Sequence, residues 1–232
     1  MSILQEKLDF LLDKYAVANK ATLTEDGKCV TVAGKTYPIL PWRSERRFAE
    51  LKKMVDTKTV GSISHFKIMS LNPKTVALDE VLLRELDTAE FIGSLAVTQI
   101  FKAENGPAAS VICMTDKEAV ITLELSNNLK EGAEVIDKHE IITDRGTACD
   151  RAMDSQTPLY SLYVYGEETA EYTDVDFELY GLTAELVAIV RGAFDIAKNP
   201  ALGEENQAVY NRLLSLVEAA SLSAEKCENV IL

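Results

Sequence analysis

The sequence predicts an α+β protein whose large, mainly antiparallel sheet is covered by helices on one face. Two observations carry this prediction. Six strand-like segments follow one another at short spacing in the middle of the chain, and helical patterns precede and follow them. Asn105-Gly106 marks a tight hairpin turn between the first two of the six. Because strands joined by short turns pair antiparallel, these segments are expected to share one sheet.

Residues 1–43 are predicted to form an extension, made of a helix and a β-hairpin, that precedes the main domain at residues 44–232. Residues 2–19 show the apolar spacing of an amphipathic helix, with Ser2 and Gln5 at the spacing of a capping box. The extension is therefore expected to begin with a capped helix.

The hairpin of the extension is predicted from its turn. Lys28–Val32 and Lys35–Ile39 flank Ala33-Gly34, a two-residue turn in which glycine supplies the positive φ angle. After it, Ser44 can cap a helix that runs to Val55.

The elements of the main domain follow from hydrophobic periodicity and turn residues. Strands are expected at Ser62–Leu71, Leu95–Lys102, Ala108–Met114, Ala119–Leu125, Val135–Thr143, Ala148–Met153 and Leu159–Tyr165. Helices are expected at Val76–Ile92, Val175–Lys198 and Glu204–Glu225, with Asn199-Pro200 separating the last two.

Two of the expected strands alternate, but neither has a face as cleanly polar as a half-solvated antiparallel sheet normally shows. Tyr160–Tyr165 and Ala119–Leu125 show this pattern. Helices are expected to cover one face and a partner sheet much of the other, which predicts a homo-oligomer that pairs through the sheet face.

Composition and charge exclude several classes of partner. With 24 basic and 37 acidic residues the net charge is −13, which argues against nucleic acid and anionic membranes. No apolar run approaches the roughly 20 residues of a membrane span, and the first residues lack a secretory signal, so a cytoplasmic protein is expected. With two histidines and four scattered cysteines, no metal site is expected.

Three stretches, in their order and spacing, resemble the C-terminal, sheet-bearing domain of the Gfo/Idh/MocA oxidoreductases. Residues 46–70, RRFAELKKMVDTKTVGSISHFKIMS, are similar to the passage that leads from a helix into the first sheet strand. Residues 97–129 and 138–148 resemble consecutive sheet strands, and residues 211–232 resemble the closing helix and tail. The resemblance covers residues 46–232.

The resemblance also shows which family features these 232 residues do not contain. A Rossmann unit needs a G-x-G-x-x-G turn at a helix N-terminus, and the 11 glycines are scattered. The E-K-P segment that carries the family's catalytic lysine has no counterpart. We therefore expect no cofactor on this chain, with NAD(P) bound only through a partner subunit.

The family's D-x-x-x-H motif and its following acidic residue correspond to Glu80, Arg84 and Asp87. In the family the histidine is a general acid/base toward the sugar hydroxyl. An arginine stays protonated near pH 7 and cannot replace it, so the family's dehydrogenase chemistry is not expected here.

Each candidate residue has two interpretations. Glu80, Arg84 and Asp87 share a helix face, which predicts either a solvated, salt-bridged stripe or a clamp for a carboxylate or hydroxyl-rich ligand. His139, and likewise His65, is either structural or functional on its strand. Trp42 and Arg46 suit either sugar stacking or anion contact, or else a helix start packed on the domain.

Two functions follow as hypotheses. In the first, the chain is an oligomerising, accessory subunit in carbohydrate metabolism that pairs with itself or with a separate Rossmann-bearing chain. In the second, it binds or converts a sugar or ketosugar without a cofactor through the inherited substrate face.

Overall fold

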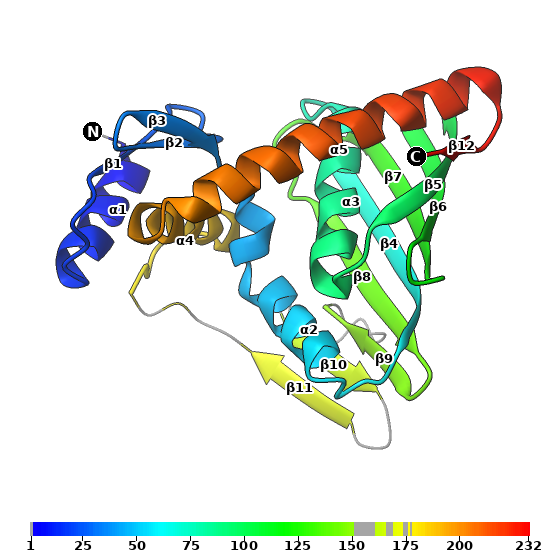
Figure 1. Cartoon of the computed structure of the whole chain (residues 1–232), viewed down its shortest axis with the longest axis horizontal. Helices are drawn as coiled ribbons and strands as arrows, with labels where there is room; N and C mark the ends of the chain where they lie inside the picture. The colour runs from blue at the N-terminus through cyan, green and yellow to red at the C-terminus, as the bar shows by residue number, and fades with distance from the viewer. Residues whose placement is uncertain (1, 151–160, 166–168, 174–175, 177) are drawn as a thin grey trace. The chain divides into compact units, whose positions relative to one another are not determined.

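The computed structural model describes residues 2–150, 161–165, 169–173, 176 and 178–232, with the backbone alone for 161–165 and 169–173 (Figure 1). The chain divides into two compact units. The first combines Met1–Ala49 with Val175–Arg212, and the second combines Glu50–Asp174 with Leu213–Leu232. The boundary predicted between residues 43 and 44 concerns the extent of the family-like domain and stays a prediction. The compact units follow another division, because segments distant in sequence pack together.

The first unit joins a three-stranded antiparallel sheet to helices from both parts of the chain. Its elements are α1 (Ile3–Lys14), β1 (Ala21–Leu23), β2 (Cys29–Val32), β3 (Lys35–Pro38), the 3₁₀ turn η1 (Pro41–Ser44), α4 (Ala184–Lys198) and the first half of α5 (Ala201–Lys226). Leucines of α1, valines of β2 and apolar residues of α4 form its core: Leu8, Leu11, Val30, Val32, Val190 and Phe194.

The predicted hairpin of the first unit is present. β2 and β3 meet at Ala33 and Gly34, whose φ angles are 51° and 80°. Two positive φ angles belong to the turn whose twist matches that of the flanking strands, and glycine takes this conformation without steric cost.

The predicted N-terminal cap is also present, since the Oγ of Ser2 accepts a hydrogen bond from the backbone N–H of Gln5 at 3.3 Å. The Gln5 side chain does not complete the capping box: its amide donates to Asp9 and to β1. The helix ends at Lys14, five residues earlier than predicted, and Ala16 has a left-handed φ of 49°.

The second unit is a nine-stranded sheet in the order β11-β10-β9-β8-β4-β7-β6-β5-β12. Its elements are most of α2 (Arg46–Asp56), β4 (Ile63–Pro73), α3 (Leu78–Gly93), β5 (Val97–Asn105), β6 (Ala108–Thr115), β7 (Val120–Leu129), β8 (Ile136–Thr143), β9 (Gly146–Cys149), β10 (Ser161–Tyr165), β11 (Thr169–Thr173), the end of α5 and β12 (Val230–Ile231). β4 and β7 are parallel, and every other pair in the described sheet is antiparallel. The predicted α+β class with a mainly antiparallel sheet is confirmed.

The two faces of this sheet differ in burial. α3 packs on β4 and β7, and the end of α5 reaches β5, where the N–H of Lys102 donates to the Ser223 Oγ at 3.0 Å (Figure 1). The covered side, here called the hidden face, carries Phe66, Ile68, Val111, Ile121 and His139. The opposite side, the open face, carries His65, Lys67, Ile112, Met114 and Glu140.

Several element boundaries differ from the prediction. α4 begins at Ala184 rather than at residue 175, because Thr183 caps it and accepts from the N–H of Leu186. Ser44 lies in η1, and α2 begins two residues later. The short strands β1, β11 and β12 were not predicted, since they are too short or too polar to show a clear period.

Two predicted strands extend outside the described residues. Ala148–Met153 is described as far as residue 150, and Leu159–Tyr165 from residue 161. The two-sided pattern proposed for Tyr160–Tyr165 concerns side chains outside the description. In β7, Leu123 is buried, Thr122 half-buried and Glu124 exposed, so the predicted alternation of this strand is present, with its polar residues on the open face. Among the described helices none is long and apolar enough to span a membrane.

Candidate functional site

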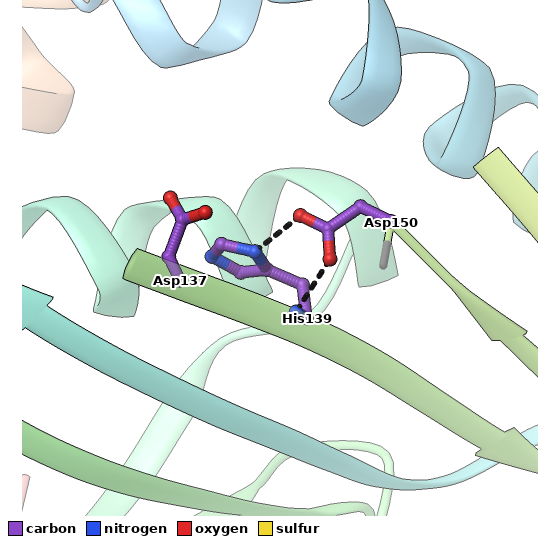
Figure 2. Close-up of side chains that lie close together, drawn as sticks. All are labelled: Asp137, His139 and Asp150. Atoms are coloured by element: carbon purple, nitrogen blue, oxygen red, sulfur yellow. Dashed lines mark hydrogen bonds and ion pairs between the residues drawn. The ribbon is translucent and has the colours of Figure 1, made fainter. Parts of the chain in front are cut away.

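The candidate site is centred on His139, which is buried on the hidden face of β8. Its Nδ1 lies 2.6 Å from the Asp150 Oδ2, and its Nε2 lies 2.8 Å from the Glu85 Oε2. The other Asp150 oxygen accepts a 2.7 Å hydrogen bond from the backbone N–H of His139, as Figure 2 shows. Both ring nitrogens therefore face a buried carboxylate.

Local structure brings these groups together. Asp137 and His139 are two residues apart on a strand, so both point to the hidden face. Asp150 directly follows β9, which pairs antiparallel with β8, and its N–H donates to the His139 carbonyl at 3.2 Å. Glu85 comes from α3, the helix that covers this face. β8, α3 and the residue that follows β9 thus contribute side chains to one cluster in the second unit.

Charge governs the pKa values in the cluster. Burial by itself would lower the pKa of His139, but Asp150 and Glu85 outweigh it and raise that pKa to about 10. Burial would likewise raise the pKa of Glu85, but the Arg84 guanidinium and His139 lower it to about 2. Near neutral pH the ring is an imidazolium that donates to both carboxylates.

Arg84 connects this core to the edge of the cluster. Its guanidinium donates to the Glu85 Oε1 at 2.6 and 2.8 Å, to the Asp137 Oδ2 at 3.0 Å and to the Ser70 Oγ at 3.4 Å. The side chains of Arg84 and Asp137 are 22% and 11% exposed, whereas those of Glu85 and Asp150 are fully buried. The network is therefore buried at His139 and reaches solvent at Arg84.

The prediction of one solvated stripe on α3 is wrong. Glu80 is exposed, Arg84 is half-buried and Asp87 is fully buried. Most residues of α3 from Val81 onward are buried, so its side chains are covered around most of the helix and no continuous solvated face remains. The structure pairs Arg84 with Glu85 and Asp137, which lie off the predicted stripe.

The two histidines lie on opposite faces of the sheet. His65 is half-buried on the open face, where its Nε2 is 2.8 Å from the Thr122 Oγ1. Burial, followed by the nearby Lys67, lowers its pKa. His65 therefore takes no part in the cluster around His139.

Trp42 and Arg46 belong to the first unit. Trp42 is half-buried in η1, and Arg46 is exposed at the first residue of α2. The neighbouring Arg47 pairs with Glu45 at 2.7 Å and lies over the Phe48 ring at 4.3 Å. A sugar contact at Trp42 and Arg46 stays a prediction.

Sequence reasoning missed Glu85, Asp137 and Asp150. The spacing of Asp137 and His139 on a predicted strand was a usable signal, because it places both on one face. Asp150 is brought next to His139 by the β8–β9 register, which pairs Glu140 with Cys149 and becomes visible only in the structure. Nothing in the sequence indicated that Glu85, rather than Glu80 or Asp87, faces the sheet.

Comparison with known proteins gives one kind of match. No family model matches the sequence, and no curated protein matches it. Among solved structures, a putative oxidoreductase from Thermotoga maritima has a TM-score of 0.64 at 15% identity, over 84% of this chain and 63% of its own. An oxidoreductase domain protein from Kribbella flavida has a TM-score of 0.67 at 13% identity, over 83% and 64%. Levoglucosan dehydrogenase, in complex with NADH and levoglucosan, has a TM-score of 0.67 at 14% identity, also over 83% and 64%.

This chain shares the fold of part of each of these oxidoreductases. The resemblance to the sheet-bearing domain of the Gfo/Idh/MocA enzymes is thus confirmed at the level of the fold. The chain spans 63–64% of the length of the structures it matches. At 13–15% identity the match defines architecture, and activity has to be argued from residues.

Proposed function

We propose that the chain is the oligomerising, sheet-bearing subunit of a cytoplasmic carbohydrate oxidoreductase assembly, in which a Rossmann-type partner chain binds the nicotinamide cofactor. The observation that carries this proposal is the fold match. It extends over 83–84% of this chain, and the matched structures include a sugar dehydrogenase bound to NADH.

The contacts of Arg84 support an accessory role. This residue stands where the resemblance places the family's catalytic histidine, and its guanidinium is held between Glu85 and Asp137. A guanidinium in such ion pairs accepts no proton near pH 7. The subunit then contributes shape and binding surface, and the proton acceptor comes from elsewhere in the assembly.

The open face supports pairing with a second copy of this chain. Ile112 and Met114 are 46% and 38% exposed, and the register sets them opposite Phe101 and Val120. The same face carries both basic and acidic side chains, namely Lys67, Lys138, Glu124 and Glu140. Since a two-fold interface sets one face against its own copy, such a mixture allows opposite charges to meet around an apolar centre.

Light scattering on the purified chain tests this pairing. We expect a dimer, and we expect Ile112→Lys to shift it toward the monomer because it places a charge in the apolar centre. Leu214→Lys is the matched control: Leu214 is 42% exposed on α5, away from the open face, and its change should leave the dimer intact. A wild-type chain that stays monomeric at tens of micromolar would refute pairing through this face.

Purification from native cells tests the assembly. The tagged full chain should retain a Rossmann-type polypeptide in stoichiometric amount, identified by mass spectrometry. The isolated chain should leave NADH fluorescence unchanged, whereas the assembly should alter it. Recovery of this chain alone, at native salt concentration, would contradict the accessory role.

A second candidate function is supported by the solvent-facing end of the cluster. Arg84 is held by the buried Glu85 and in turn holds Asp137, as in a preorganised site for a hydroxyl-rich or carboxylate ligand. Thermal unfolding with a panel of sugars, ketosugars and sugar acids tests it. A ligand that raises the Tm of the wild type but not of Arg84→Gln would favour this function over the first.

A further inference from the structure

The inference concerns three neighbouring side chains in the cluster around His139 that carry metal-binding atoms. Asp137, His139 and Asp150 each present one nitrogen or oxygen, and these three atoms lie within 4.8 Å of one another (Figure 2). We propose that Asp137, His139 and Asp150 form a binding site for a divalent transition-metal cation. The site does not depend on the assembly proposed above.

The backbone fixes the three donors before any cation arrives. Asp137 and His139 are alternate residues of β8 and project from the same face of the sheet. Asp150 is held against β8 by two hydrogen bonds, from the His139 N–H to its Oδ1 and from its own N–H to the His139 carbonyl. Two of the donors lie on a paired strand and the third directly follows one, and donors held by regular elements keep their geometry better than donors on loops.

The surrounding residues provide the support that a ligating histidine normally has. Glu85 accepts from the His139 Nε2, which leaves Nδ1 facing the Asp150 carboxylate. Arg84 in turn holds both Glu85 and Asp137. A carboxylate on the far nitrogen orients the ring of a ligating histidine and makes it a better donor. A cation bound at the imidazole replaces one of the two ring protons, and that proton is released to solvent.

The donor set selects the class of cation. One imidazole with two carboxylates suits Mn²⁺ or Zn²⁺, whereas Mg²⁺ and Ca²⁺ favour sites made only of oxygen. Three protein ligands leave a coordination position for water or for a ligand oxygen. Asp137 is the most exposed of the three, so the open position is expected on its side.

Isothermal titration of the full chain, after removal of bound metal with a chelator, is the primary test. Mn²⁺ is the first probe because thiols bind it weakly, so the four cysteines do not compete. We expect one Mn²⁺ per chain, tighter binding of Zn²⁺, and no comparable binding of Mg²⁺ or Ca²⁺. Asp137→Asn should weaken Mn²⁺ binding by more than the ~10–100-fold typical of losing an outer partner.

Glu140→Gln is the matched control, since Glu140 lies on the same strand but on the open face, and it should bind Mn²⁺ like the wild type. Imidazole ¹⁵N spectra of the wild type add a readout that does not depend on the folding of a variant. The chain has two histidines, so only two imidazoles have to be assigned. Zn²⁺ should remove the proton from one His139 nitrogen and leave His65 unchanged. A wild type that binds no Mn²⁺ or Zn²⁺, with His139 protonated on both nitrogens in excess Zn²⁺, would overturn the proposal.

Discussion

The two faces of the sheet shift the pKa of a histidine in opposite directions. On the open face, His65 is half-buried beside Thr122, and burial together with Lys67 lowers its pKa. On the hidden face, His139 is fully buried between Glu85 and Asp150, and its pKa rises to about 10. Deeper burial alone would lower the pKa further, so the comparison shows that the paired carboxylates outweigh burial.

Replacement of each histidine by glutamine gives the largest contrast between the faces. His139→Gln leaves the buried carboxylates of Glu85 and Asp150 without their shared cation. Removing one partner of a buried ion pair costs about 3–5 kcal/mol, and we expect a loss of that order in the free energy of unfolding. His65→Gln removes one half-buried hydrogen bond and should cost ~1 kcal/mol or less. Urea denaturation measures both, and equal losses would break the comparison.

The carboxylates on the two faces give a smaller contrast. Glu85→Gln keeps the shape of the side chain but removes the charge that Arg84 and His139 share, so a loss of about 2 kcal/mol is expected. Glu140→Gln on the open face affects a partly exposed pair with Lys138 and should cost under ~1 kcal/mol. Urea denaturation in the presence of a chelator compares the two, and a larger loss at Glu140 would contradict the account.

The pH dependence of stability is the smallest effect when it is expressed per pH unit. The free energy of unfolding changes by at most ~1.4 kcal/mol per pH unit for each proton that is bound or released. Because the folded pKa of His139 is raised, its stabilisation is complete below pH 6.5 and is lost as pH rises toward about 10. Glu85, whose folded pKa is lowered, stabilises fully above pH 4.5 and loses this effect as pH falls toward about 2. Together they favour the fold most between pH 4.5 and 6.5.

His65 has the opposite sign to His139. Its pKa is lowered on folding, so it makes the protein less stable as pH falls through its ordinary value of 6.5. The free energy of unfolding, measured from pH 5 to 10 in the presence of a chelator, should no longer decrease at alkaline pH in His139→Gln. In His65→Gln it should decrease less at acid pH than it does in the wild type. An alkaline decline that persists in His139→Gln would mean that another group causes it.

Much of the fold could be predicted because it depends on local patterns. The turn at Ala33-Gly34, the strand alternation from Leu95 to Thr143 and the break at Asn199-Pro200 each indicate one conformation. Short strands such as β12 form only because a neighbour pairs with them, and the beginning of α4 depends on the cap at Thr183.

The site was less predictable because it depends on contacts between distant segments. Asp137 and His139 share a face through local alternation, whereas Glu85 reaches His139 across 54 residues of sequence. The wrong prediction of a solvated stripe shows the same limit. Helical spacing groups Glu80, Arg84 and Asp87, but only packing decides which side of α3 the sheet covers.

The most direct test is the imidazole ¹⁵N spectrum of the metal-free chain at pH 8, with the signals assigned through His65→Gln. The account predicts that His139 is protonated on both ring nitrogens while His65 is neutral. A neutral His139 at pH 8 would contradict it, because the two carboxylates would then fail to hold the proton and the two faces would not differ.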